Sequence, residues 1–358
     1  MGHGLKGILL RRGRRLAIGS ALEVAAILAR MRLGSALRGQ GVIFTLHHVR
    51  PEIHLGFVGN RHLEITPDFL DTAILQLRDE NYEFIRLEDI SERINEPHAR
   101  PFACFTLDDG YRNNRDHALP VFERHDVPFT IFVTRGLAER THSLWWETLG
   151  QLLHREETIT FDFGNGPEDL RLPSETLKLM AFKRFARLIA SEDEASVIRR
   201  IDNLAQGSGV DPLKITADLV MNGDELRKIA GHPLASLGAH TISHRALARL
   251  PHEEVRQEIR GSVDWVEGLS GTRPQTFAYP YGFSAAVCAR DTEIARDAGL
   301  SVAVTTKPGI INGQSPDRLT ALPRVSLNGY FQKRRYVSAL ASGIPFALSR
   351  HKPVKGTS

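Results

Sequence analysis

The chain has 358 residues, 42% of them hydrophobic, which is ordinary for a globular protein with a substantial core. Its formal charge of +4 comes from the two ends: residues 1–41 hold eight Lys or Arg against one acid and residues 333–358 hold six against none, which leaves 32 basic and 41 acidic residues between them. A net acidic body argues against a nucleic-acid-binding domain, whereas basic ends suit an anionic membrane surface.

The basic N-terminal segment combines arginines with a short apolar run. Arg11 to Arg15 include four arginines, and the run from Leu16 to Ala29 that follows is interrupted by Glu23. This run is too short to span a bilayer and no small-residue cleavage site follows it, so we predict neither a spanning helix nor a secretory signal. We predict an amphipathic helix on the inner face of a membrane, with a solvated arm as the alternative. Cys104 and Cys288 give no disulfide framework, which is compatible with a cytoplasmic protein.

Apolar, strand-like runs alternate with helical patterns along the chain, and this rhythm predicts an α/β fold with a parallel barrel. One break, from about residue 145 to about 215, holds helix-period segments and a Gly-rich stretch, and we interpret it as a helical insertion over the barrel. The chain then divides into an N-terminal arm (1–41), a barrel unit with this insertion (42–330) and a basic tail (331–358). The predicted strands are Val42–Leu46, Phe102–Leu107, Phe129–Val133, Ala235–Ala239, Thr276–Tyr279, Ser301–Thr305 and Ala321–Val325.

Two adjacent carboxylates, Asp108 and Asp109, close the predicted strand Phe102–Leu107 and precede Gly110. Open α/β sheets and α/β barrels keep their chemistry at this C-terminal edge of the strands. Neighbouring strand residues point to opposite faces, so one carboxylate could bind a metal while the other moves a proton. A strand-terminating turn is the alternative, because Asp and Gly are ordinary turn formers.

Two further motifs follow. His240 and His244 are four residues apart, and on a helical turn both imidazoles would reach one ion; a pair of surface histidines is the alternative. In Phe277–Gly282 a short strand runs into an X-Pro turn. Such a turn would hold backbone N–H groups and aromatic rings at the edge of a site.

Taken in this order, the three motifs resemble the motif series of the polysaccharide deacetylases, the NodB-homology or carbohydrate esterase family 4 enzymes. The resemblance covers about residues 42–330. Within it, Phe44–Val49 is similar to the first barrel strand of many bacterial members, and Leu144–Glu147 is similar to the aromatic segment that opens a helical insertion in one subgroup. The resemblance implies a distorted (β/α) barrel and metal-dependent removal of an N- or O-acetyl group from a carbohydrate.

Residue by residue, the resemblance implies that Asp109, His240 and His244 are metal ligands and that Asp108 is the catalytic base. The backbone N–H of Tyr281 takes the position of the donor to the tetrahedral oxyanion, with a side chain that lines the sugar site as the alternative role of this residue. An Asp/His/His set with open coordination positions suits a divalent ion, and we expect Zn²⁺. Such an ion polarises the acetyl carbonyl and activates a water molecule.

Two departures from the family pattern affect the catalytic groups. The arginine that tethers the base in the family is replaced by Ala278, and we take Arg324, at the end of a late strand, as its substitute, with an ordinary exposed arginine as the alternative. The family's last motif supplies a histidine as general acid, whereas after the third motif the only histidine here is His351, in the basic tail. We predict that His48, and with less support His47, supplies the acid from the end of the first strand, with a structural histidine as the alternative.

We therefore expect an enzyme that removes acetyl groups, N-acetyl before O-acetyl, from a polysaccharide, an oligosaccharide or a glycan precursor. The alternative is a catalytically silent carbohydrate-binding protein on the same fold. Asp108 beside a complete ligand set weighs against that alternative, because a pure binder does not need the base.

Overall fold

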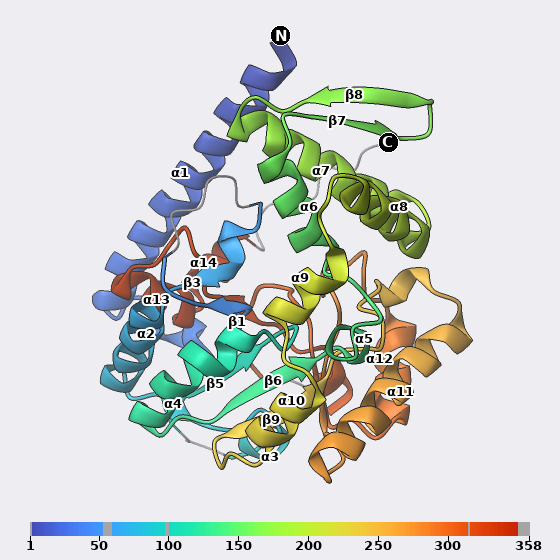
Figure 1. Cartoon of the computed structure of the whole chain (residues 1–358). Helices are drawn as coiled ribbons and strands as arrows, with labels where there is room; N and C mark the ends of the chain where they lie inside the picture. Colours follow the sequence, from blue (N-terminus) through green and yellow to red (C-terminus); the bar gives the residue numbers. More distant parts are fainter. Residues whose placement is uncertain (1, 53–58, 97–99, 314–315, 350–358) are drawn as a thin grey trace.

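The computed structural model describes residues 2–52, 59–96, 100–313 and 316–349. Within these residues, eight parallel strands form one curved sheet at the centre of the molecule (Figure 1). The strand order is β11-β10-β9-β6-β5-β1-β12, with β4 paired to β5. The strands are β1 (Gly41–Leu46), β4 (Glu83–Phe84), β5 (Phe102–Leu107), β6 (Phe129–Val133), β9 (Ala235–Ala239), β10 (Thr276–Ala278), β11 (Val302–Val304) and β12 (Val325–Ser326).

The two edges of this sheet approach each other near the end of β11. Val304 forms a parallel bridge with Leu322, shortly before β12, and the backbone N–H of Thr305 donates to the carbonyl of Leu322 at 2.9 Å. The sheet is therefore curled into a distorted barrel, and the predicted α/β fold is confirmed.

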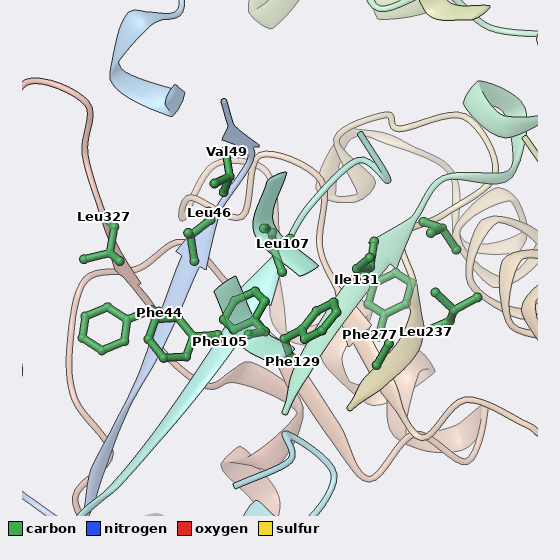
Figure 2. Packing of buried hydrophobic residues seen from close by; sticks show 14 of the residues in the cluster. Phe44, Leu46, Val49, Phe105, Leu107, Phe129, Ile131, Leu237, Phe277 and Leu327 are labelled. Atoms are coloured by element: carbon green, nitrogen blue, oxygen red, sulfur yellow. The ribbon is translucent and has the colours of Figure 1, made fainter. Parts of the chain in front are cut away.

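The strands are apolar at nearly every position because elements cover both faces of the sheet. All six residues of β1 and of β5 are buried. Phe44 lies opposite Phe105 in the parallel register, and their rings stack with centroids 5.4 Å apart. Figure 2 shows how Phe129, Ile131 and Phe277 of the neighbouring strands extend this core.

Helices between the strands cover the sheet. In α2, for example, Thr66 caps the N-terminus by accepting a hydrogen bond from the backbone N–H of Phe69, and Pro67 occupies the first turn. A small second sheet pairs β2 (His48–Val49) with β3 (Glu64–Ile65). The covering helices are α2 (Pro67–Asp79), α3 (Ile90–Arg93), α4 (Leu119–His125), α5 (Arg135–Ala138), α10 (Gly223–Ala230), α11 (His252–Ser270) and α12 (Ala289–Asp297).

Most of the N-terminal arm is one helix, α1 (Gly2–Arg30), which runs along one flank of the molecule (Figure 1). It packs on α13 (Arg334–Ala341) and α14 (Ile344–Ser349) through a cluster of buried side chains. That cluster comprises Leu22, Ala25, Ala26, Tyr336, Ala339 and Ile344. None of the helices in the described part of the chain is both long enough and apolar enough to cross a membrane.

The insertion begins with α6 (Trp145–Arg155) and gathers its elements on one side of the sheet (Figure 1). It has a core of its own that includes Trp146, Phe185 and Ile201. It is helical as predicted, but it also contains an antiparallel hairpin that the prediction missed, in which alternate residues of the first strand are buried. The further elements are β7 (Thr158–Asp162), β8 (Pro167–Arg171), α7 (Glu175–Ser191), α8 (Glu194–Gly207) and α9 (Pro212–Leu219).

Candidate metal and catalytic site

A cavity of about 180 Å³ lies where β1, β5 and β9 end and where α6 of the insertion begins. The sequence motifs meet there, although they are far apart in the chain. The residues that line the cavity are His47, Asn60, Leu63, Asp108, Asp109, Trp145, Trp146, His240, His244, Tyr281 and Thr306.

Asp109, His240 and His244 form a compact group of three possible metal ligands, whose ligand atoms all lie within 4.8 Å of one another. Nε2 of His240 lies 3.6 Å from Oδ1 of Asp109, and Nε2 of His244 lies 3.3 Å from the same oxygen. Asp109 and His240 are buried, so neither a solvent-facing turn nor a pair of surface histidines describes them.

His240 presents a lone pair that suits a cation. Nδ1 of His240 donates a hydrogen bond to the carbonyl oxygen of Ala278 at 2.6 Å, which fixes the proton on Nδ1 and leaves the lone pair of Nε2 toward Asp109. Burial lowers the pKa of His240 to about 4, so this ring is neutral at pH 7. Burial raises the pKa of Asp109, but the neighbouring His244 outweighs it and holds the pKa below its usual range.

Oδ1 of Asp109 is the strongest sign of a missing partner. It is buried, and no residue in the described ranges donates a hydrogen bond to it. An anionic oxygen in that position is costly unless a cation lies against it. The three residues therefore fit a divalent ion, and they could hold one with coordination positions left open for substrate and water.

The backbone of the second motif differs from the expectation. His240 and His244 lie on a loop after β9, not on a helical turn, and both Thr241 and His244 adopt left-handed conformations with φ of 68° and 57°. Two consecutive backbone N–H groups between the histidines, those of Ile242 and Ser243, donate to Oε2 of Glu258 on α11 at 2.8 and 2.9 Å. Sequence reasoning missed Glu258, which holds this loop in place.

Asp108 is held by a buried arginine. Nη1 and Nη2 of Arg324 donate to Oδ1 and Oδ2 of Asp108 at 2.7 and 2.6 Å, a bidentate pair. Nε of the same guanidinium donates to the carbonyl of Thr305, and Nη1 also donates to the hydroxyl of Thr106. Burial raises the pKa of Asp108, but the charge of Arg324 outweighs burial and lowers the pKa below its ordinary value. The structure thus places Arg324 in contact with Asp108, as expected for a substitute of the family's arginine.

The structure brings His47, and not His48, into the cavity. Nε2 of His47 lies 3.9 Å from Oδ2 of Asp108. The ring of His48 is fully buried on the other side, in contact with the tilted ring of Tyr111 at 3.7 Å between ring centroids, and its Nε2 lies 3.5 Å from Glu147. The expected position of His48 beside Asp108 is therefore wrong, because neighbouring residues of an extended segment point to opposite sides.

Comparison with known proteins agrees with this geometry. The family model for polysaccharide deacetylase matches residues 95–174 and 210–303, and the gap between the two matches falls on α7 and α8 of the insertion. The chain belongs to the polysaccharide deacetylase family.

Solved structures of polysaccharide deacetylases share the fold. A polysaccharide deacetylase from Bacillus cereus is 15% identical with a TM-score of 0.53, over 85% of this chain and 68% of that one. IcaB from Ammonifex degensii is 18% identical with a TM-score of 0.51, over 85% of this chain and 97% of that one. No curated protein matches the chain by sequence.

In this member of the polysaccharide deacetylase family, the insertion completes the site through a residue that sequence reasoning missed. Tyr281, at φ 59°, donates from its hydroxyl to Oε1 of Glu194 on α8 at 2.7 Å and accepts from Nε1 of Trp145 at 2.9 Å. Oε2 of the same glutamate accepts from the backbone N–H of Ala246, just beyond the second histidine. Glu194 thus ties the aromatic turn to the histidine loop.

Proposed function

We propose that the protein is a metal-dependent hydrolase that removes acetyl groups, N-acetyl first of all, from a carbohydrate. The observation that carries the proposal is the buried Asp108–Arg324 pair directly beside the Asp109–His240–His244 group. Burying two charges costs several kcal/mol per ion before their attraction is counted. A protein that only bound carbohydrate would gain nothing from a carboxylate held in this way, so the catalytically silent alternative is less well supported.

The mechanism assigns a role to each residue. Asp109, His240 and His244 would hold the ion, expected to be Zn²⁺, which when bound supplies polarisation of the acetyl carbonyl and of a water molecule. Asp108 takes the proton from the water as it attacks, and Arg324 keeps that carboxylate ionised and oriented.

Two further steps complete the reaction. The backbone N–H of Tyr281, at the cavity wall, donates to the oxyanion as the carbonyl carbon becomes tetrahedral. Cleavage of the C–N bond then expels an amine, which leaves only when it receives a proton. We propose that the proton taken by Asp108 passes to His47, whose Nε2 lies 3.9 Å from the carboxylate, and from there to the amine.

Removal of the His47 imidazole tests this relay. His47→Ala should lower kcat on N-acetyl substrates by about 10²- to 10⁴-fold, the usual contribution of a general acid. An activated aryl acetate should lose much less, because its leaving group needs no proton. Metal content, measured in parallel, should be unchanged. Equal losses on both substrates would instead assign His47 a structural role.

Acetate release tests the activity itself. The purified protein, loaded with Zn²⁺ or Co²⁺, should release acetate from at least one member of a panel of N-acetylated glycans, and a chelator should stop the release. Glycan binding by the metal-loaded protein without acetate release on any of them would support the catalytically silent alternative.

We also propose that the protein acts in the cytoplasm against the inner face of the membrane, with residues 42–330 as the catalytic unit and the segments 1–41 and 331–358 as its membrane-facing flank. Residues 350–358, which contain the end of the basic tail, lie outside the described residues. The exposed side chains of α1 support the proposal.

The exposed side of α1 carries large apolar side chains. Leu16, Val24 and Ile27 of α1 are 71%, 52% and 58% exposed, and Met31, which follows α1 and whose backbone N–H still donates to the carbonyl of Ile27, is 64% exposed. At 3.6 residues per turn the four positions fall within about a quarter of the helix circumference, opposite the buried side chains that pack on α13 and α14. An exposed apolar stripe of this kind is typical of a helix that lies in a membrane interface.

The charges of the N-terminal arm also support contact with an anionic membrane. Glu23 is the only acid in residues 1–41, and it faces the body of the protein, where it accepts from Arg335 and Tyr336. These partners lower the pKa of Glu23 to about 2. Arg30, the last residue of α1, and Arg32, in the turn that follows, are exposed cations, and such charges complement anionic lipid headgroups.

Sedimentation with vesicles measures this contact. Wild-type protein should bind vesicles that contain phosphatidylglycerol and should not bind pure phosphatidylcholine vesicles at physiological salt. Ile27→Glu with Met31→Glu should reduce binding to the anionic vesicles at least tenfold, whereas Leu177→Glu, at an exposed apolar residue of the insertion, should not. Failure of the wild-type protein to bind anionic vesicles would contradict the proposal. Equal binding by the Ile27→Glu/Met31→Glu variant and by Leu177→Glu would contradict it as well.

A further inference from the structure

A buried histidine and glutamate face each other outside the catalytic cavity, and the mechanism uses neither of them. His48 is fully buried, and its Nε2 lies 3.5 Å from Oε1 of Glu147. Glu147 belongs to α6, the first helix of the insertion, and only 17% of its side chain is exposed. Two ionisable groups are costly to bury, so this pair points to a role other than filling space.

Asn113 fixes the protonation of His48. The side-chain oxygen of Asn113 accepts from the backbone N–H of Val49 at 3.1 Å, so the amide nitrogen is the atom that lies 2.7 Å from Nδ1 of His48. An amide nitrogen only donates, so Nδ1 accepts and carries no proton. The proton of the ring is then on Nε2, which faces Glu147. Nε2 has no ordinary hydrogen bond among the described residues, so the charge of Glu147 is the attraction that acts on this proton.

Glu147 is ionised in its buried position. Burial raises the pKa of Glu147, but His48 outweighs burial, together with Arg50 and Asn60, and holds the pKa below its usual range. Asn60 is buried as well and lines the catalytic cavity. One carboxylate therefore acts both on a residue of the cavity wall and on the buried histidine.

Two adjacent asparagines hold the segment that carries His47 and His48. Nδ2 of Asn114, which is fully buried, donates to the backbone carbonyl of His47 at 2.7 Å. Asn113 contacts the next two residues, through the ring of His48 and the N–H of Val49. The side chain of His48 is therefore one of the points that fix the backbone after His47.

The direction of His48 determines the direction of His47. Consecutive side chains of an extended segment point to opposite sides, so His47 faces the cavity while His48 stays on the other side. In this arrangement Nε2 of His47 lies 3.9 Å from Oδ2 of Asp108. A misplacement of about 1 Å in a reacting group can cost about 10²-fold in rate, so whatever holds His48 affects the proton transfer through His47.

We propose that Glu147 is a positioning residue: its carboxylate holds the ring of His48 on the far side of the segment, and this keeps His47 directed at Asp108 and at the leaving amine. The inference rests on the proposed deacetylase function and on the proton relay through His47. It gives the insertion a part in catalysis, because α6 carries Glu147.

Removal of the charge on Glu147 tests the proposal. In the Zn²⁺-loaded protein, Glu147→Gln should lower kcat on N-acetyl substrates at least tenfold and on an activated aryl acetate at most threefold, because the aryl leaving group needs no proton from His47. Metal content should be unchanged. Glu175→Gln, at an exposed glutamate of α7, is the matched control and should behave as wild type. Equal losses on both substrates, or no loss on either, would overturn the inference.

A double variant separates action through His47 from a general effect on the fold. In a His47→Ala background, Glu147→Gln should cause no further loss on N-acetyl substrates, because the group that Glu147 positions is already absent. Losses that multiply in the double variant would overturn the inference. If Glu147→Gln does not fold, His48→Gln replaces it, with the same selective loss expected.

Nuclear magnetic resonance of protein labelled with ¹⁵N-histidine gives a measurement that does not need activity. Wild-type His48 should show the Nε2–H tautomer at pH 7, and Glu147→Gln should speed the exchange of that proton with solvent at least tenfold and shift the His47 signals. If no substrate releases acetate, the proposed function fails on those substrates, while these spectra still report on the positioning. An Nδ1–H tautomer of His48, or His47 signals that do not change in Glu147→Gln, would overturn the inference.

Discussion

His240→Ala and His244→Ala should each lose the stoichiometric divalent ion and, with it, acetate release. Each variant removes one of two imidazole nitrogens that lie 3.3–3.6 Å from Oδ1 of Asp109. The two ligands that are left cannot enclose an ion, and a water molecule would have to replace the lost nitrogen. Without the ion, neither the carbonyl nor the attacking water is polarised, so the loss of turnover should reach several orders of magnitude.

Elemental analysis of the purified variants measures the ion directly. His252→Ala is a suitable control, because that histidine is exposed on α11 and lies outside the cavity. A chelator should abolish the activity of the wild type, and added Zn²⁺ should restore it. Undiminished ion content in both His240→Ala and His244→Ala would show that the three residues do not form one metal site.

The central strands could be predicted from the sequence almost to the residue. β5, β6 and β9 have the predicted bounds, because strands buried on both faces appear as uninterrupted apolar runs. The last strand could not be placed as well. It was predicted at Ala321–Val325, whereas β12 spans only Val325–Ser326 and the chain before it enters a 3₁₀ segment, Pro316–Ala321. A pair of residues is too short to show a period.

The ligand group could be found because its residues lie in motifs, but the residues that hold the motifs could not. Glu258 and Glu194 each accept from backbone N–H groups of the histidine loop. A backbone N–H is the same for every residue type, so no pattern in the sequence marks such a partner. The left-handed conformations of Thr241 and His244 could not be predicted from the sequence either, because neither residue is a glycine.

Which of His47 and His48 faces the cavity depends on the register of the chain to within one residue. His47 follows β1 directly and His48 begins β2, and a one-residue shift reverses which side of an extended segment a side chain faces. The deciding contact is that of the His48 ring with the ring of Tyr111, on the side away from the cavity. Tyr111 comes from the turn after β5, so the information needed was tertiary.

Asp108→Asn should keep the ion and lower kcat by about 10²- to 10⁴-fold, the range expected for loss of a general base. The amide has the shape of the carboxylate but cannot accept the proton of the attacking water. Metal binding should persist, because the three ligand atoms belong to Asp109, His240 and His244.

The same substitution should also destabilise the fold. Arg324 is only 1% exposed and makes two of its hydrogen bonds to Asp108, so an asparagine leaves a buried charge without its counter-ion. Breaking one side of a buried pair costs about 3–5 kcal/mol. Thermal denaturation should show this cost, and kcat is to be taken from folded, metal-loaded protein at a temperature well below the lowered Tm. Under those conditions, near-normal turnover would rule out Asp108 as the base, and loss of the ion would show that the roles of the two aspartates are exchanged.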